Sequence, residues 1–503
     1  MVKIKPLIKI GFIIAFLIVT AIVSYFIFSK SKGEATALED HANLSQSIAI
    51  LPFVNASADS SQDYFGDGLT DEIINSLSYL KGLKVCARAS SFKFKKKSVG
   101  IKKIGTDLGV SNILEGSFQL QGDRVIISAQ LINVDDSIHL WSAKYDENLD
   151  EIFALQDKIA NAIADKLKIT LLGNQHQPGS KKQTTNIEAY QLYLKGRSFW
   201  NLKTPPALKK GIDFFQQVIK LDASYAAAYS GLADCYMALG YGSFLAPNDA
   251  FPKALEAATK AATLDSTLAD AHASLGYYKF YYDWDWAAAE QEFRKCLALN
   301  PNYELGYDWY GYYLTAMERY DEASVILKKA ASLDPLSVSI STDMGFSFYY
   351  GGNYDPAIKE LKASLQVDSN FLLAHLWLGR SYQAQKAYPD AINELKKTMK
   401  VSVNWPVALA AIGSAYAESG DKINAKIILD TMISLMPKKF VTAYGIALVY
   451  SALGEKEEAF LWLNKAFDER SNWLVWLKTD PRWNMIKSDK RFHEMVNRVG
   501  LPQ

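Results

Sequence analysis

The sequence predicts an α/β domain followed by an all-α superhelix of helix pairs, an α-solenoid, behind a single N-terminal transmembrane helix. Three patterns indicate this. Residues 10–28 are apolar and uncharged, residues 44–172 alternate between strand-like and helix-like patterns, and the remainder repeats small residues every 34 positions. With 503 residues, 49% apolar and 22% charged, the composition is that of a folded protein with two or three units. The net charge of +1 creates no field that would attract nucleic acid, so direct nucleic-acid binding is not expected.

The N-terminal segment is expected to cross a membrane. The uncharged run IGFIIAFLIVTAIVSYFIF covers residues 10–28. As a helix it would span about 28 Å, close to the hydrocarbon thickness of a bilayer. A cleaved signal peptide is the alternative, but its apolar core would be only about 7–15 residues long. Three lysines precede the run and two follow it, which predicts a cytoplasmic tail over residues 1–9 and the remaining chain on the other side.

After a polar spacer over residues 29–43, residues 44–172 are predicted to form an α/β domain with a mixed sheet. The expected order is strand, helix, strand, helix, three strands and a helix. The first strand is the apolar run that begins at Ser47, and the second runs from Leu83 to Phe92. A hairpin turn beginning at Gln121 separates two alternating strands, and an amphipathic helix follows from Leu149.

Two charged motifs of this domain have simple structural interpretations. Asp67 precedes an apolar periodic stretch and is expected to cap the first helix. The run KFKKK at 93–97 is interpreted as the solvated end of a strand, with contact to anionic lipid as the alternative. Neither motif predicts catalysis.

Beyond a polar linker over residues 173–186, self-similarity at 34 residues dominates the region 187–472 and predicts about eight helix pairs. One series of small residues comprises Gly311, Gly345, Gly379, Gly413 and Ala447. A second series, 12 residues later, comprises Ala323, Ala357, Ala391, Ala425 and Ala459. Small residues let two helices of a hairpin approach closely, so Gly379 is expected to face Ala391. Residues 473–503 are expected to cap the end of the array.

These positions resemble the tetratricopeptide repeat (TPR) family, with its small residue at the eighth position, Ala at the twentieth and Pro near the thirty-second, as in Asp334-Pro335. The resemblance covers residues 187–503. It implies a right-handed superhelix whose first helices line a concave groove. By this resemblance, the partner-binding groove is lined by Tyr277, Phe280, Tyr281, Asp308, Tyr312, Phe346, Tyr349, Tyr350 and Arg380. Tyr and Arg often dominate interface energetics. The alternative is that several of these rings belong to the core between repeats.

Phe346, Tyr349 and Tyr350 would lie on one helix face, whereas Met344 and Phe348 would fill the core-facing positions of the same helix. This aromatic stripe is therefore expected to be an exposed binding patch, with Arg380 beside it to pair with a partner carboxylate.

Residues 44–172 resemble a TolB N-terminal-like domain, through SIAILPFVNASADSSQDYFGDGLTDEIINSL, ILEGSFQLQGDRVIISAQLINVDDSIHLWSAKYD and EIFALQDKIANAIADKL. Such domains precede TPRs in the periplasmic parts of CadC-like regulators and of cyclase-TPR proteins. The resemblance implies a single-pass protein of the bacterial inner membrane with a periplasmic bulk. In such proteins a DNA-binding or cyclase module usually precedes the membrane helix, whereas only about nine residues precede it here, so a direct output role is not expected.

No catalytic, cofactor or metal site is expected, because the sequence contains no phosphate-binding glycine loop, no GxSxG elbow and no HExxH helix. The three cysteines are too widely spaced for a disulfide framework or zinc site and are predicted to be buried thiols. His272 and His375 occupy the same repeat position, which favours packing or groove lining. The turn Asp283–Trp286 is more typical of packing between two helices than of a sugar site.

The function predicted from the sequence is a membrane-anchored interaction scaffold or sensory protein that binds a protein or peptide partner in its TPR groove. The alternative is the receiver part of a signalling or transcription-regulatory system whose output module is a separate protein. A glycan-active enzyme would need a carboxylate arrangement that no motif indicates.

Overall fold

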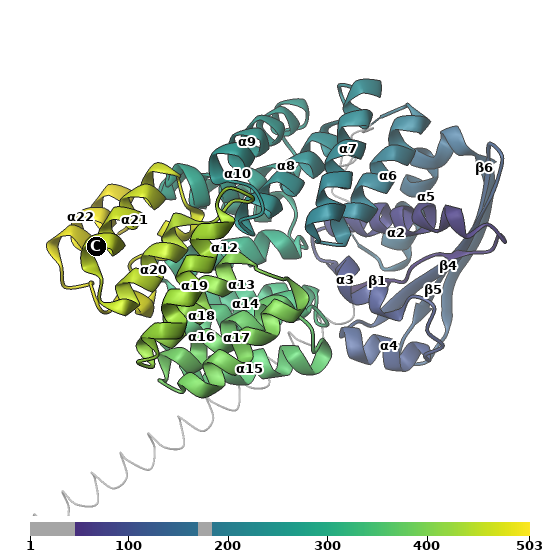
Figure 1. Ribbon diagram of the computed structural model, residues 1–503. Coiled ribbons are helices and arrows are strands. Elements are labelled where there is room, and N and C mark those ends of the chain that lie inside the picture. The colour runs from purple at the N-terminus through teal and green to yellow at the C-terminus, as the bar shows by residue number, and fades with distance from the viewer. Residues whose placement is uncertain (1–45, 170–183, 503) are drawn as a thin grey trace, which may run out of the picture.

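The computed structural model describes residues 46–169 and 184–502 (Figure 1). The helix predicted over residues 10–28, the spacer over 29–43 and most of the linker over 173–186 lie outside the described residues. Within the two described ranges, no helix is both long and apolar enough to cross a membrane.

The first described range forms an α/β domain around a mixed sheet with the order β3-β1-β4-β5-β6, in which β2 also pairs with β4. The strands are β1 (Ser47–Ile50), β2 (Val54–Asn55), β3 (Lys84–Val85), β4 (Asn112–Gln121), β5 (Arg124–Asn133) and β6 (His139–Asn148). β1 is parallel to β3 and β4, whereas β4, β5 and β6 form an antiparallel meander. The apolar residues of α2 (Asp63–Ser78) and α5 (Ile152–Lys166) cover one face of this sheet, and α4 (Ile101–Leu108) covers the other. The predicted strands and helices occur in the predicted order, and the structure adds the two-residue strand β2 and a short helix after β3.

Three local predictions in this domain are wrong: the extent of the second strand, the cap at Asp67 and the strand-end position of the basic run at 93–97. The second strand was expected to continue to Phe92, but it ends at Val85 and the chain enters a short helix α3 (Arg88–Ser91). The reason is tertiary, because the amide and hydroxyl of Ser90 both donate to the Asp334 carboxylate of the helical array, at 2.9 and 2.5 Å. Asp67 does not cap a helix, since α2 begins at Asp63.

The basic run lies beside α2 rather than at a strand end. The Lys95 ammonium pairs with the Asp67 carboxylate at 2.5 Å, and Lys96 pairs with Asp63 at 3.0 Å. Acids of the first helix therefore neutralise part of this run.

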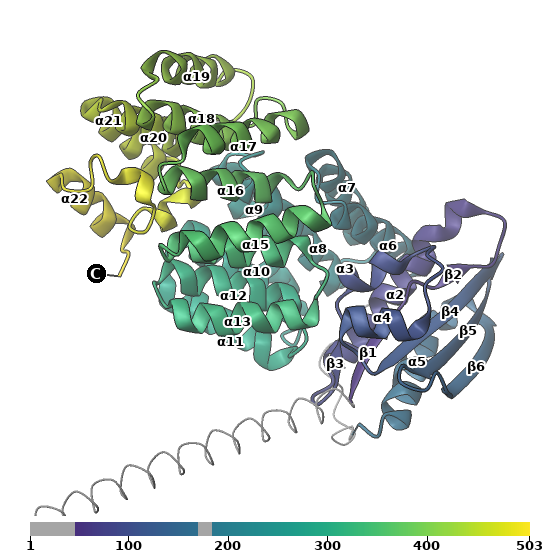
Figure 2. The ribbon, with the colours of Figure 1, turned by 90° about the horizontal axis from the view of Figure 1, so that it is seen from below.

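The second described range consists mainly of antiparallel helix pairs, stacked side by side (Figures 1 and 2). Eight pairs are present among the described residues. They are α6 (Ile187–Asn201) with α7 (Pro205–Leu221), α8 (Ala226–Tyr241) with α9 (Pro247–Leu264), α10 (Ala269–Tyr278) with α11 (Trp286–Leu299), α12 (Glu304–Ala316) with α13 (Tyr320–Leu333), α14 (Val338–Tyr350) with α15 (Tyr354–Val367), α16 (Leu372–Ala384) with α17 (Tyr388–Val401), α18 (Pro406–Glu418) with α19 (Lys422–Leu435), and α20 (Ala443–Leu453) with α21 (Lys456–Asp468).

Three of the repeated glycines lie directly against the second helix of their own pair. A Cβ added to Gly379 would lie 2.5 Å from the Leu395 side chain and 3.1 Å from the Ala391 carbonyl oxygen. Gly311 and Gly345 meet a leucine of their own second helix at 2.5 and 2.6 Å. The prediction that Gly379 faces Ala391 across one hairpin is confirmed.

The two histidines at equivalent repeat positions connect the helices of their own pairs. His272 Nδ1 lies 2.6 Å from the Glu292 carboxylate, and His375 Nδ1 lies 2.5 Å from that of Glu394. Packing is therefore the correct interpretation. The three cysteines are free and buried, as predicted.

The helix-breaking turns of the array hold the α/β domain. The amide of Asn302 donates to the carbonyl oxygens of Ser78 and Leu83 at 2.9 and 2.8 Å, while its oxygen accepts from the Val85 amide at 3.2 Å. Asn302 is only 5% exposed. Figure 2 shows the two parts in contact along this side of the array. A buried amide that saturates three backbone groups fixes their relative position.

Candidate functional site

The nine predicted groove residues do lie together, on the first helices of the third to sixth pairs and on η4 (Lys279–Asp283), a short π-helical turn that follows α10. Their rings are in mutual contact: Tyr277 and Tyr281 are 4.5 Å apart between centroids, and Tyr312 and Phe346 are 5.0 Å apart. None of the nine is more than 6% exposed. The expectation that Phe346, Tyr349 and Tyr350 form an exposed stripe is therefore wrong.

The chain itself covers these rings. We call residues 471–501 the C-terminal segment; it comprises η5 (Asn472–Trp476), η6 (Pro481–Trp483) and α22 (Lys490–Val499). Trp476, which is fully buried, stacks on Tyr350 at 4.4 Å and meets Phe346 edge-on at 4.8 Å. It also approaches Phe280 at 6.1 Å. The predicted end cap thus packs over η4 and α14.

The loop of the second pair completes this cover. It lies between α8 and α9, and its Gly242 carbonyl accepts from the Trp405 indole at 3.2 Å. The Trp473 indole donates to Ser243 Oγ at 3.4 Å and its ring stacks on Tyr241 at 6.1 Å. A loop of the second pair thus meets the turn before α18 and the C-terminal segment. The alternative interpretation of the groove rings, as core, is the one that the packing supports.

The turn at 283–286 also serves this packing. Trp284 has a positive φ of 60° and is buried against Phe467 at 5.2 Å, with the Arg470 guanidinium 4.4 Å from its ring. The Asp285 side chain accepts from the Ala288 amide and caps α11. The packing interpretation of this turn is confirmed.

Two buried carboxyl groups, Asp308 and Asp343, lie close together among the tyrosines. Burial, and after it the neighbouring charge of Asp343, raise the pKa of Asp308 well above its ordinary value. Burial also raises the pKa of Asp343 to about 7, although hydrogen bonds from Tyr312 and Ser339 oppose that rise. Two adjacent buried carboxylates repel each other strongly, so the pair retains a proton near neutral pH.

The C-terminal segment carries its own buried ion pair. Arg482 contacts both carboxylate oxygens of Asp480, Nε at 2.9 Å and Nη2 at 2.6 Å. Burial would raise the pKa of Asp480, but the Arg482 guanidinium holds it below its ordinary value. Tyr444 donates to Asp480 at 3.2 Å and accepts from the Trp483 indole at 2.8 Å.

Arg380 has no such partner. It is 2% exposed, its Nε and Nη1 have no hydrogen-bond partner, and it forms no ion pair with any described residue. Its guanidinium lies 4.5 Å from the Trp377 ring and 5.4 Å from the Trp473 ring. Burial, and after it the positive charge of Arg482, lower the pKa of Arg380 to about 10.

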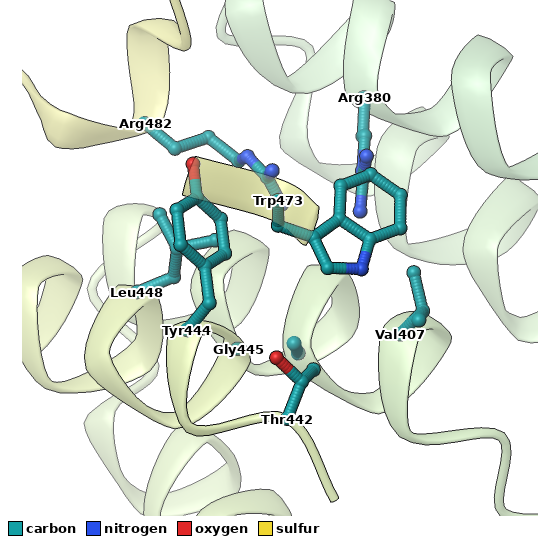
Figure 3. A pocket seen from close by; sticks show the side chains of 9 residues that line it. Arg380, Val407, Thr442, Tyr444, Gly445, Leu448, Trp473 and Arg482 are labelled. Carbon is teal, nitrogen blue, oxygen red and sulfur yellow. The ribbon is translucent and has the colours of Figure 1, made fainter. Parts of the chain in front are cut away.

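A small pocket opens at this point, between α16, α18, α20 and the C-terminal segment. The enclosed space is only large enough for about one water molecule. Figure 3 shows Arg380 and Arg482 reaching toward the Trp473 ring from different elements, with Tyr444 and Val407 below. Sequence reasoning found Arg380 but missed Arg482, Asp480 and Trp473. The Asp-Pro-Arg-Trp motif at 480–483 could have identified Asp480 and Arg482, whereas no sequence pattern marks Trp473.

Both parts of the chain are similar to known proteins. Residues 306–335 match the tetratricopeptide repeat model, and the solved structure of PilF from Pseudomonas aeruginosa aligns with 41% of this chain and 93% of its own, at 22% identity and a TM-score of 0.31. Residues 306–335 thus match a tetratricopeptide repeat, and the helical region is TPR-like. Its eight helix pairs form the TPR domain discussed below.

Residues 44–162 match the model of the HilA/YgeH-like transcriptional regulator, second domain. Putative adenylate cyclase 3 of Rhizobium meliloti is 36% identical over 187 residues, 37% of this chain and 32% of that protein. The transcriptional regulator HilA of Salmonella typhimurium is 25% identical over 283 residues, 53% of this chain and 50% of that protein. The chain therefore spans about a third to a half of the length of these curated relatives.

Proposed function

We propose that this protein is a membrane-anchored, non-catalytic interaction protein whose TPR domain binds a protein or peptide partner. The observation that supports this proposal is the stack of eight helix pairs, a fold that creates extended binding surfaces rather than catalytic clefts. The α/β domain, fixed to the array through Asn302, would hold the TPR domain in a set orientation to the membrane.

Residues 10–28 would anchor the chain in a bacterial inner membrane, with the N-terminus in the cytoplasm and the bulk in the periplasm. The length of the apolar run and the lysines before it support this placement. A reporter active only outside the cytoplasm, fused after Gln503, should be active, and protease added to spheroplasts should digest the TPR domain. Full protection from the protease would contradict the placement.

The nine groove residues remain the proposed partner site, reached when the C-terminal segment moves away from the concave face. The segment occupies the side of the superhelix that the family resemblance assigns to peptides, so segment and partner would compete. Loosening the segment should then increase partner capture. Crosslinking in intact cells, comparing the parent chain with Trp476→Ala, tests this. If Trp476→Ala captures every partner as the parent chain does, the binding face lies elsewhere, and the α/β domain is then the first place to test.

A second candidate function is the receiver part of a regulatory system whose output module is a separate protein. The match of residues 44–162 to a domain of transcriptional regulators favours it. Under this proposal a cytoplasmic regulator contacts residues 1–9 or the membrane helix. A photocrosslinker at Lys5 should trap a DNA-binding protein or a nucleotide cyclase. Crosslinks only to proteins without such modules would favour the scaffold.

A further inference from the structure

We propose that the outer edge of β6 pairs, in the antiparallel direction, with β6 of a second copy of this chain. Residues 142–148 of the two copies would then join the two sheets into one. This interface goes beyond the proposed partner function, because it uses the α/β domain and leaves the TPR groove unused. Figures 1 and 2 both show β6 at the rim of the molecule, on the side away from the TPR domain.

The backbone along the outer side of β6 has no hydrogen-bond partner among the described residues. β6 ends the strand order and pairs with β5 alone. The Leu149 amide donates to the Asp123 carbonyl oxygen at 2.7 Å. Because successive residues of an antiparallel strand direct their N–H and C=O groups to opposite sides, the even-numbered residues from 142 to 148 direct theirs away from β5. Such an edge is a template for a further strand.

The outer part of β6 lacks the usual protection of an edge strand. Native edges are often very short or interrupted by proline or a bulge. β6 is ten residues long, and its one register shift lies close to Leu140, near the start of the strand. Residues 142–148 contain no proline or glycine and pair with β5 in unbroken register. Seven consecutive residues are therefore regular enough to accept a strand.

The charges on the exposed face of β6 select the partner. Lys144 is exposed and forms no ion pair with any described residue, while the Asp146 carboxylate is 47% exposed beside Arg124. An incoming strand is favoured if it places an acid opposite Lys144 and a base opposite Asp146. β6 itself meets both requirements when it runs antiparallel with Tyr145 on the two-fold axis. Lys144 of each copy then lies opposite Asp146 of the other.

The same charges fix the register. Only every second residue directs its backbone outward, so a symmetric pairing can slip only in steps that move the axis to a neighbouring residue. With Lys144 on the axis, two lysines would lie directly opposite each other. With Asp146 on the axis, two aspartates would do so. Like charges directly opposite are destabilising, so both neighbouring registers are disfavoured.

The other face of β6 adds apolar contact in the chosen register. Tyr145 is partly buried and packs against the core of the α/β domain, as does Trp141. On the axis the two Tyr145 residues would form a non-hydrogen-bonded pair, in which side chains lie closest. Each ring would cover part of the other. The second copy thus extends the apolar layer while residues 142–148 form about eight backbone hydrogen bonds across the axis.

A pair of charge variants tests the interface on the purified full-length chain in detergent, by sedimentation over a range of concentrations. Lys144→Asp and Asp146→Lys should each weaken self-association about tenfold or more, because each places like charges opposite at two positions. Mixing the two variants should restore association, since every pair across the axis then combines an Asp with a Lys. Lys102→Asp on α4 makes the same charge change at another exposed lysine and should associate like the parent.

Three results would overturn the proposal. A monomeric parent chain would leave the edge of β6 to a strand of another protein. A dimer that neither variant weakens would place the interface on another surface. If both variants weaken the dimer but their mixture does not recover it, Lys144 and Asp146 do not lie opposite each other.

Disulfide crosslinking tests the register separately. The α-carbons of a non-hydrogen-bonded pair are about 4.5 Å apart, within the range of a disulfide. Tyr145→Cys should therefore yield a covalent dimer under mild oxidation. Ser142→Cys is the matched control, because the two copies of residue 142 would be about 20 Å apart and should not crosslink. The three native cysteines are buried. Equal crosslinking at 142 and 145 would contradict the pairing.

Discussion

Trp476→Ala tests whether the C-terminal segment covers the rings of η4 and α14 in solution. The indole is fully buried and contacts three rings, those of Phe280, Phe346 and Tyr350. Truncating a buried Phe or Trp to Ala costs about 3–5 kcal/mol, including the cavity left behind. Because the contact joins the segment to the array, we expect about 4 kcal/mol to be lost from the docking of the segment.

Amide hydrogen exchange on the full-length chain measures this loss locally. Repeat arrays need not unfold as one unit, so a single melting curve would average over segments. Four kcal/mol corresponds to about a thousandfold in the opening equilibrium. Protection over residues 471–501 should fall by about that factor, with a smaller fall in α14.

Leu461→Ala on α21 is the matched control. Leu461 is 64% exposed, so its truncation should change stability by about 0.5 kcal/mol or less. If Trp476→Ala alters exchange in the C-terminal segment no more than this control does, the segment is not docked. The aromatic stripe of α14 would then be open in solution, as the sequence alone suggests.

Three further predictions concern stability. Gly379→Leu should lower the free energy of unfolding by about 1–3 kcal/mol, because the added side chain overpacks the hairpin against Leu395. Gly100→Leu is the control and should be close to neutral in urea titrations, since a Cβ at Gly100 would meet nothing within 4 Å. Equal costs for the two variants would contradict the repeat register. Burial raises the pKa of Asp343 to about 7, so the folded chain holds a proton that the unfolded chain releases near pH 4, and the parent loses stability as pH rises from about 4 to 7. Asp343→Asn should therefore gain up to about 4 kcal/mol relative to the parent at pH 8 and little at pH 4, and equal differences at both pH values would refute it. Asn302→Ala should cost about 3 kcal/mol of domain docking, seen as faster amide exchange at β3, and unchanged exchange there would exclude its anchoring role.

The helix pairs were predictable because the information for them is local. A hairpin brings Gly379 next to Leu395 through a short turn, and small residues recur at the same interval in the fourth to eighth pairs. A small residue is needed wherever two helix axes approach closely, whatever surrounds the pair. The mixed sheet of the α/β domain was predictable for a similar reason, since alternation in β4 and β5 and the turn at Gly122 specify a hairpin within the segment.

Whether the groove residues are exposed or covered was not predictable from local sequence patterns. Helical periodicity identifies the face that carries Phe346 and Tyr350, but not the segment that covers it. The covering residue, Trp476, follows more than a hundred positions later in a short run, NWLVW, without helical or strand periodicity. The wrong prediction of a strand at α3 has the same cause. Ser90 donates hydrogen bonds to Asp334, which lies in a turn distant in the sequence, and its neighbours in the sequence do not reveal this contact.

The contact between the C-terminal segment and the TPR domain is well packed but incompletely hydrogen-bonded. The hydroxyls of Tyr281, Tyr349 and Tyr350 and the indole N–H of Trp476 are buried without partners among the described residues. Each such group costs about 1–3 kcal/mol relative to a satisfied one. The buried aromatic area therefore favours docking, while these polar atoms oppose it. A peptide whose backbone accepted hydrogen bonds from the three tyrosine hydroxyls would gain hydrogen bonds that the C-terminal segment does not provide. That balance, rather than an open groove, is the physical basis on which a partner could replace the segment at the concave face.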